Sequence, residues 1–427
     1  MTFNMPATKP NGIFFGWHVV AATFVLAMFG WGIGFYGAPV LLHAVRETKE
    51  WRLEIISAAI TAHFLFGALV AANLPKLHRR FGVPFVVKAG AISLALGIVG
   101  WALAYEPWHM FVAAVFSGAG WVSIAAVTVN TIIAPWFFRA RPAALATAYN
   151  GASIGGVVFA PLLVFMIANL GFPIAATVLG TSMVFTVWFL SDRYFARSPS
   201  DMGLTPDGDA AGDLAKPVTA PHATPVPGKL LWKSRQFQTL AAGMALGMFV
   251  QGGLVAHLLS LLVPALGSML AGFAMSLATL SAICGRMIVG WFMPVGADRR
   301  LAACINLFVQ IVGSLALFAA QGSNVPLLFV GVILFGIGIG NGTSLPPLIA
   351  QIEFVREDVM RVVALVVALS QFTWAFAPLT FGMLRVSFDA RTGSESFLFL
   401  VAAFLQAMAI AVFLLGRTSR PTSQALA

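Results

Sequence analysis

The sequence is poor in charged residues. Asp, Glu, Lys and Arg make up only 9% of its 427 residues, whereas 59% are hydrophobic. Soluble globular domains carry about 25% charged residues, so the composition excludes a soluble domain of this size. The hydrophobic runs are also longer than the strands of a membrane β-barrel, which span about 9–11 residues. We therefore predict an all-α polytopic membrane protein, whose backbone satisfies its own hydrogen bonds within helices.

Several chemical signatures are missing as well. The sequence contains no Gly-x-x-x-x-Gly-Lys-Ser/Thr phosphate loop, which disfavours ATP-driven transport. Its hydrophobic runs contain no metal-ligand cluster and no set of nucleophile, base and orienting residue, so we expect neither an enzyme nor a cofactor. The two cysteines, Cys284 and Cys304, both lie in hydrophobic runs, where apolar packing is the expected role.

Hydropathy predicts twelve transmembrane helices. An α-helix rises about 1.5 Å per residue, so crossing a hydrocarbon layer about 30 Å thick takes roughly 20 apolar residues. Runs of this kind cover residues 17–43, 53–74, 84–104, 108–135, 143–168, 173–194, 236–260, 269–294, 300–320, 325–351, 360–386 and 395–416. The first is too long, and lacks the basic leader, for a signal peptide. An even number of helices places both termini on one side.

The basic residues gather on one side of these helices. A net charge of +10 is compatible with nucleic-acid binding, but the positions of the charges follow the membrane instead. One side holds Lys9, Lys76, Arg79, Arg80, Lys88, Arg139, Arg141, Arg299, Arg300, Arg356, Arg361, Arg417 and Arg420. Basic loops stay in the cytoplasm. We therefore predict that this side, including both termini, is cytoplasmic, and that the partner is the lipid bilayer rather than nucleic acid.

The chain divides into two similar halves. Residues 195–235 are rich in Pro, Gly, Ala and charge and cannot bury enough apolar surface to fold alone. We predict a cytoplasmic linker there, between six-helix bundles over 1–194 and 236–427. "FAPLL" at 159–163 returns as "FAPLT" at 376–380, one of several matches at an offset of about 217 to 220, which indicates a duplicated half. Two such repeats around a central site form a transporter architecture.

These features resemble the major facilitator superfamily over essentially the whole chain. "APWFFRARPAALATAYNGASIGGVVFAPL" at 134–162 is similar to the helix 4–5 signature of its monocarboxylate and oxalate porters. The segments 256–267 and 285–290 fall where such porters carry a His and an Arg. The loop "NLPKLHRRFG" at 73–82 lacks the superfamily's acidic residue, and Ala282 replaces an Asp of the eukaryotic monocarboxylate porters.

The resemblance implies a secondary active transporter of the bacterial inner membrane, acting as a monomer. It would move a small organic anion, with a monocarboxylate favoured, by alternating access of the two bundles and in symport with protons. The basic loops at 78–82 and 298–300 would latch the cytoplasmic face. A transport-inactive receptor with the same fold is the alternative.

Arg286 is the strongest candidate for a binding residue. It lies about eight residues from the cytoplasmic end of its helix, roughly 12 Å into the bilayer, where a charge costs about 2.5 kcal/mol or more unless it is paired or solvated. No acidic residue lies at that depth in a predicted helix. A carboxylate of the substrate matches the guanidinium fork. Alternatively, Arg286 snorkels to the interface or binds carbonyls at a helix end.

Histidines are the candidates for proton coupling. His63 lies near the middle of the second predicted helix and His257 in the outer part of the seventh, and the pKa of a histidine can be moved through neutrality by its surroundings. The alternatives are that the substrate brings the proton, that the carrier exchanges anions, or that both rings are neutral packing residues.

Uncharged polar and aromatic residues near the midplane are further candidates. Those expected to line a path between the halves are Tyr36, Tyr149, Asn150, Gln251, Gln371 and Trp374. Polar side chains also join helices in membranes, so about half of this set is expected to be structural.

A copper site is the competing hypothesis. Met244 and Met248 are one helical turn apart, and thioether pairs select Cu(I). The arrangement resembles bacterial copper importers of the same superfamily, in which a His and a Met follow on the next helix. Here Met275 is present, but Ala271 replaces the His. Methionine pairs at this spacing also arise from packing.

Overall fold

The computed structural model describes residues 14–138, 140–208, 228–292, 297–342, 344–392 and 394–417. All regular structure in these residues is helical, and ten of their helical segments are long and apolar enough to cross a membrane. One of these segments is α10 (Arg235–Phe292), which contains two predicted spans because Gly267 interrupts it at φ 70°. Another predicted span, 325–351, is divided into two shorter helices. The chain is therefore consistent with the predicted twelve-helix fold.

Seven predicted spans are continuous helices. They are α3 (Leu53–Phe81), α4 (Val83–Leu103), α7 (Arg141–Leu170), α8 (Phe172–Leu190), α11 (Arg299–Ala320), α14 (Arg356–Thr392) and α15 (Phe397–Leu415). Short elements η2 (Ser191–Phe195), η3 (Ser200–Met202), η4 (Pro206–Gly208) and α9 (Gly228–Lys233) accompany them.

Three predicted spans are broken near their middle or end. The first contains α1 (Phe15–Phe29), the π-helix η1 (Gly30–Phe35) and α2 (Ala38–Lys49); the fourth contains α5 (Pro107–Ser123) and α6 (Ala126–Ile133); the tenth contains α12 (Val325–Ile339) and α13 (Leu345–Glu353). Since most residues at the breaks are apolar, aromatic or glycine, hydropathy averaged over a span does not detect them. The breaks matter because they expose backbone groups inside the bundle.

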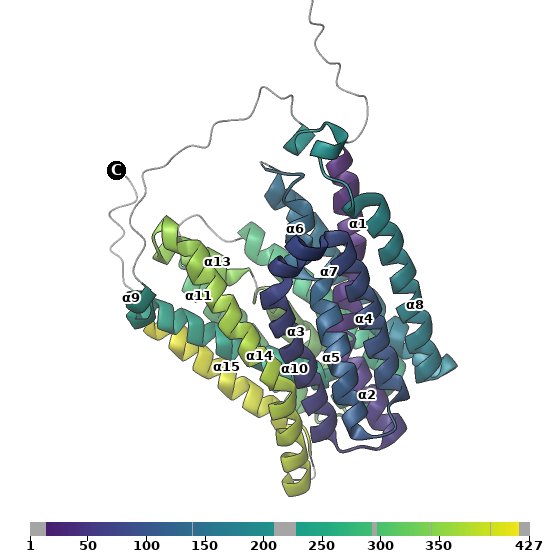
Figure 1. Ribbon diagram of the computed structural model, residues 1–427. Helices are drawn as coiled ribbons and strands as arrows, with labels where there is room; N and C mark the ends of the chain where they lie inside the picture. Colours follow the sequence, from purple (N-terminus) through teal and green to yellow (C-terminus); the bar gives the residue numbers. More distant parts are fainter. Residues whose placement is uncertain are drawn as a thin grey trace, which may run out of the picture.

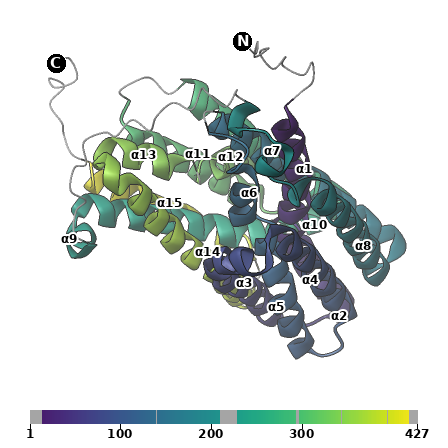
Figure 2. The same cartoon turned by 45° about the horizontal axis from the view of Figure 1, so that its top comes forward.

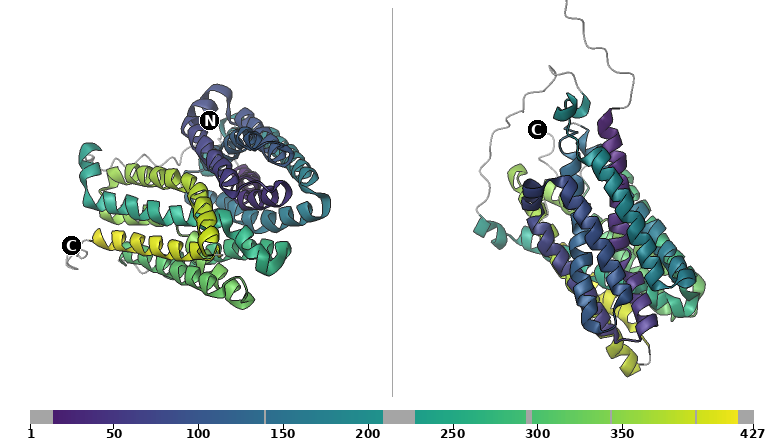
Figure 3. Two further views of the ribbon diagram at one scale, coloured as in Figure 1. Left: turned by 90° about the horizontal axis from the view of Figure 1, so that it is seen from below. Right: turned by 45° about the vertical axis from the view of Figure 1, so that its right-hand side comes forward.

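The helices pack in two groups. We call α1 to α8 the N-half, in which α4 packs on α5 and α8, and α10 to α15 the C-half, in which α10 packs on α12, α14 and α15. Figures 2 and 3 show these groups side by side. Of the predicted linker 195–235, residues 209–227 lie outside the described residues. Its first part is held by the N-half, because Asp207 accepts hydrogen bonds from the backbone N–H of Phe138 (3.1 Å) and Ala140 (3.2 Å).

The two halves are joined at the end remote from the linker. There α3 packs on α14 and α10 packs on α7 and α2, and Figure 1 shows α3 beside α14. The backbone N–H of Leu379 donates to Thr61 Oγ1 (3.2 Å), and Ser276 Oγ donates to the carbonyl of Val157 (2.7 Å). Thr61, Leu379 and Ser276 lie toward the end opposite the basic loops, which we call the outer end, and Val157 lies near the middle of α7. The two halves are therefore in direct contact at and near this end.

Candidate functional site

Arg286 lies in the second part of α10, where it meets the end of α12. It is half-buried, and its Nε donates to the carbonyl of Gly340 (3.0 Å). This bond matches the alternative in which Arg286 binds a helix-end carbonyl. The two terminal nitrogens, Nη1 and Nη2, have no hydrogen-bond acceptor within the described part of the chain. One edge of the guanidinium is therefore fixed, while its fork remains available to an anion.

A close contact between α10 and α12 holds the backbone around Arg286. A Cβ atom added to Gly340 would lie 1.9 Å from the carbonyl oxygen of Ala282, so only glycine permits this approach. Asn341 Nδ2 donates to the carbonyl of Gly285 (3.3 Å) and to Asn306 Oδ1 (2.8 Å). These contacts lock the neighbour of Arg286 to the broken part of the tenth span, which positions the guanidinium.

Tyr36 of the N-half lies close to the helix that carries Arg286. A Cβ atom added to Gly156 of α7 would lie 2.7 Å from the Tyr36 ring and 2.8 Å from the methyl group of Thr279, which precedes Arg286 by seven residues on α10. The phenol is half-buried and lies within electrostatic range of the Arg286 guanidinium.

Trp374 belongs to the same region. Its ring stacks on Phe35, which directly precedes Tyr36, with centroids 5.2 Å apart and planes inclined by 25°. Phe35 also contacts Trp121 of α5 at 5.9 Å. The aromatic residues Phe35 and Trp121 were not predicted as site residues. The position of Phe35 beside Tyr36 is the one signal that could have indicated it.

The other predicted lining residues lie apart from Arg286. Tyr149 is anchored inside the N-half, because its hydroxyl accepts from Asn130 Nδ2 (2.7 Å) and donates to the carbonyl of Ala126 (3.2 Å). The side chains of Asn150 and Gln371 are exposed, and Gln251 is buried in the C-half, so the described contacts do not bring these three side chains together.

His63 is buried within the N-half. Its Nε2 lies 3.0 Å from the carbonyl of Gly34, to which it must donate, and Nδ1 accepts from Ser117 Oγ (2.8 Å). The ring also stacks on Trp121 at 5.8 Å. Both nitrogens therefore have partners when the ring is neutral. This geometry matches the packing alternative, and a role of His63 in proton transfer stays a prediction.

His257 belongs to a charged cluster at the outer end. Its Nε2 donates to the carbonyl of Pro378 (2.9 Å), while Nδ1 accepts from Arg385 Nη1 (3.2 Å). Arg385 is fully buried and pairs through Nη2 with Glu395, whose other oxygen lies 3.5 Å from Arg46 Nη2 of the N-half. We call His257, Arg385, Glu395 and Arg46 the outer cluster.

The outer cluster connects the two halves through charge. Glu395 is its only carboxylate, and it lies between an arginine of each half. The position of Arg385 inside the hydrophobic run 360–386 is the signal that could have indicated its burial.

The chain matches a known protein family over most of its length. The model of the Major Facilitator Superfamily matches residues 19–378. The chain belongs to the major facilitator superfamily. It is therefore a multi-pass membrane transporter and not an enzyme, as the sequence predicts.

Individual relatives within the superfamily are distant. The chain is 27% identical to the MFS transporter asaE of Aspergillus flavus, covering 83% of this chain and 76% of the relative. It is 25% identical to Monocarboxylate transporter 13 of Rattus norvegicus, covering 76% and 72% respectively. Two solved structures share the fold. These are a mutant form of the nucleoside transporter NupG (TM-score 0.73, 12% identity, 94% of this chain and 100% of that one) and a bacterial homologue of the human lysosomal transporter Spinster (TM-score 0.70, 13% identity, 95% and 97%).

The predicted copper ligands of this superfamily member are buried. Met244 and Met248 line a cavity of about 20 Å³ inside the C-half, together with Gln251 and Asn306, which is space for one water molecule. Met275 is also buried, but it is not among the residues that line this cavity. The described residues contain no cluster of three or more His, Cys, Asp or Glu side chains that could hold a metal ion.

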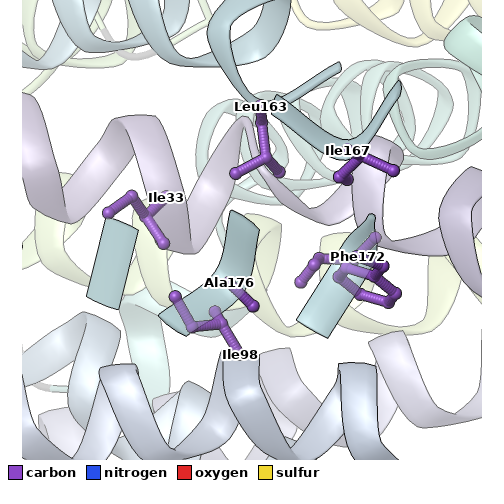
Figure 4. A pocket seen from close by; sticks show the side chains of 7 residues that line it. Ile33, Ile98, Leu163, Ile167, Phe172 and Ala176 are labelled. Atoms are coloured by element: carbon purple, nitrogen blue, oxygen red, sulfur yellow. The ribbon is translucent and has the colours of Figure 1, made fainter. Parts of the chain in front are cut away.

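A second cavity of the transporter lies inside the N-half and is apolar. Figure 4 shows its lining, which includes Ile33, Ile98, Leu163 and Phe172. Its volume is about 10 Å³, and it carries no side chain that could bind an anion.

Proposed function

We propose that this transporter moves a small organic anion, with a monocarboxylate as the favoured class, and that Arg286 binds the negative group. One observation carries the proposal: the Arg286 fork has no acceptor in the described chain, while Nε is fixed by Gly340. No described carboxylate forms an ion pair with it. A guanidinium at this depth is costly without an anion, and a carboxylate satisfies the fork with two parallel hydrogen bonds.

The position of Arg286 supports a role in alternating access. It belongs to the C-half, and Tyr36 of the N-half lies within electrostatic range. A bound anion would therefore interact with both halves and favour the states in which they are close. The rat relative that is named a monocarboxylate transporter supports the substrate class.

The orientation in the membrane follows from the basic loops. We place them, the linker and both termini in the cytoplasm, with the chain acting as a monomer in a bacterial inner membrane. The halves meet at the outer end through Thr61, Leu379 and the outer cluster, so the described state is closed outward. Proton symport through His257 or His63 completes the proposal, since no described carboxylate lies beside Arg286.

Uptake by proteoliposomes tests the proposal. Purified protein would be assayed with labelled carboxylates, with and without a pH gradient. We expect Arg286→Ala to reduce uptake at least tenfold, because one charge-assisted pair contributes about 1.5–3 kcal/mol. Arg391→Ala is the matched control, since Arg391 is an exposed arginine at the end of α14. Equal uptake by wild type and Arg286→Ala would contradict the role of Arg286, and absence of flux for every solute would favour the receptor alternative.

A further inference from the structure

The contact between Phe35 and Trp374 joins the two halves through stacked aromatic faces. Phe35 ends η1 of the N-half, and Trp374 lies on α14 of the C-half, with ring centroids 5.2 Å apart. Two-bundle carriers work by moving one half against the other. If the movement separates this stack, it uncovers two aromatic faces that prefer another flat apolar partner to water.

Two indole N–H groups in this region lack acceptors. Nε1 of Trp374 and Nε1 of Trp121 are both buried, and neither has a hydrogen-bond partner among the described residues. A buried donor without a partner costs about 1–3 kcal/mol. Trp374 is only 3% exposed, so its own surroundings do not relieve this cost. A ligand that carries acceptor oxygens would.

The backbone brings these groups toward the part of α10 that carries Arg286. Phe35 lies 5.0 Å from the ring of Tyr36. The Tyr36 ring and the methyl group of Thr279 both lie within 2.8 Å of a Cβ atom added to Gly156, and Thr279 precedes Arg286 by two helical turns on α10. The turn that carries both rings is a π-helix, an irregularity frequently found at functional sites. Gly34 permits the close approach of Trp121 to this turn, because a Cβ atom there would lie 2.4 Å from the Trp121 ring. The unsatisfied groups around Tyr36 are therefore donors from both halves, beside aromatic faces.

We propose that the substrate is a carboxylate that bears an aromatic ring, with the ring received by Phe35 and Trp374 and the carboxylate by Arg286. This inference rests on the proposed function and narrows its substrate class. Arg286 supplies the charge, while the stack supplies selectivity for the apolar part. A carboxylate with no ring, such as acetate, would use the first interaction and leave the second unused.

Matched pairs of substrates test the inference. Proteoliposome uptake would be measured for phenylacetate against acetate and for phenylpyruvate against pyruvate, so that each pair differs only by the ring. An aromatic contact contributes about 0.5–1.5 kcal/mol beyond area burial, and 1.4 kcal/mol is tenfold in affinity. We expect the phenyl compounds to have a KM at least tenfold lower in wild type.

The variants separate stacking from structure. Trp374→Leu is expected to raise KM for the phenyl compounds about tenfold and to leave KM for acetate and pyruvate within about threefold. Trp374→Phe keeps the aromatic face but removes the N–H, so it should retain most of the ring selectivity. Trp108→Leu is the control, because Trp108 is 61% exposed at the start of α5. The wild-type comparison is decisive even if a variant does not fold.

The outcomes distinguish this inference from the proposed function. Suppose that wild type takes up both members of each pair with equal KM and that Arg286→Ala takes up neither. This result would overturn the aromatic substrate class but would leave the proposal of an anion transporter standing. An equal rise of KM for both members in Trp374→Leu would overturn the role of the stack. Absence of uptake for every carboxylate would overturn both proposals.

Discussion

Arg300 and Glu353 form a two-pronged ion pair, with Nε 2.6 Å from Oε1 and Nη2 2.8 Å from Oε2. The Arg300 side chain is 1% exposed. Its remaining donors reach Thr239 Oγ1 (2.9 Å) and the carbonyls of Gln236 (2.7 Å) and Phe413 (3.3 Å). One buried guanidinium thus joins α10, α11, α13 and the end of α15. All these partners belong to the C-half, so Arg300 organises that half internally.

Removal of one partner of this pair should destabilise the C-half strongly. Breaking a buried pair leaves an uncompensated charge and costs about 3–5 kcal/mol. We therefore expect Glu353→Ala to lower the melting temperature of the purified protein clearly. Arg417→Ala is the control. The Arg417 side chain is 45% exposed and pairs with Asp298, and exposed ion pairs contribute only about 0–1 kcal/mol to stability. Similar melting temperatures for the two variants would contradict the importance of burial.

The carboxylate of Asp298 should make the stability of the folded protein depend on pH. Partial burial favours the neutral acid, but hydrogen bonds from Leu301 N and Arg417 hold the pKa of Asp298 below its usual value. A carboxyl group whose pKa is lower in the folded state than in the unfolded state stabilises the fold at pH values above the unfolded pKa of about 3.9. This stabilisation is lost as the pH falls through the folded-state pKa. We expect Asp298→Ala to melt lower than wild type at pH 7, since a lost helix cap costs about 1 kcal/mol.

The same variant should approach wild type in acid. Melting curves of both proteins between pH 7 and pH 3 would be compared. Asp298→Asn keeps a capping oxygen and loses the charge, so it separates the cap from the ion pair with Arg417. A difference between wild type and Asp298→Ala that stays constant over this range would show that the carboxylate charge contributes nothing.

Glu395 should control closure of the outer end. In Glu395→Gln the buried guanidinium of Arg385 loses its counter-ion, and the connection to Arg46 is lost with it. We expect the outer ends to separate more often. Ser57 reports this, because it is fully buried on α3 beside Gly382 of the C-half. In a protein without native cysteines, Ser57→Cys should react slowly with a water-soluble maleimide, and faster when combined with Glu395→Gln.

Glu54→Gln is the control for this experiment. Glu54 pairs at 3.1 Å with Arg52, whose side chain is 77% exposed and belongs to the same half. Its removal should leave the rate of maleimide labelling at Ser57→Cys unchanged. If both glutamate variants leave that rate at the wild-type value, the outer cluster does not hold the halves together.

The sequence predicted the helices well, because each needs about 20 apolar residues in a row, a property of composition alone. It did not predict the interruptions at Gly30–Phe35 and after Ile339, since hydropathy does not register which carbonyl each N–H reaches. The depth and isolation of Arg286 were likewise apparent. Its bond to Gly340 was not, because the acceptor is a main-chain atom 54 residues away and no side chain marks it.

Charged residues near helix ends were harder to interpret. The role of Arg300 in latching the cytoplasmic face stays a prediction; its described partners all lie in the C-half. The sequence shows that Arg300 lies at the start of a predicted span. Its burial depends on which helix, distant in the sequence, packs over it. Arg385 lies near the end of the predicted span 360–386 in the same way, and packing against α10 leaves it fully buried.

His257 should determine how transport responds to a pH gradient. The neutral ring accepts from Arg385 at Nδ1 and donates to the carbonyl of Pro378 at Nε2. A second proton would occupy Nδ1 and oppose the buried Arg385 charge, with Arg46, Glu395, His43 and Asp389 as the other charged or titratable groups nearby. Protonation should therefore weaken the outer cluster and favour opening outward.

We expect His257→Gln to exchange labelled for unlabelled anion at close to the wild-type rate but to lose accumulation driven by a pH gradient, because the ring no longer links proton binding to the outer cluster. His63→Gln is the comparison, since both nitrogens of His63 bind groups of the N-half alone; it should reduce stability and leave the response to pH unchanged. Retention of gradient-driven accumulation by both variants would mean that the substrate carboxyl group itself carries the proton. Loss of accumulation in His63→Gln alone would assign the coupling to the N-half.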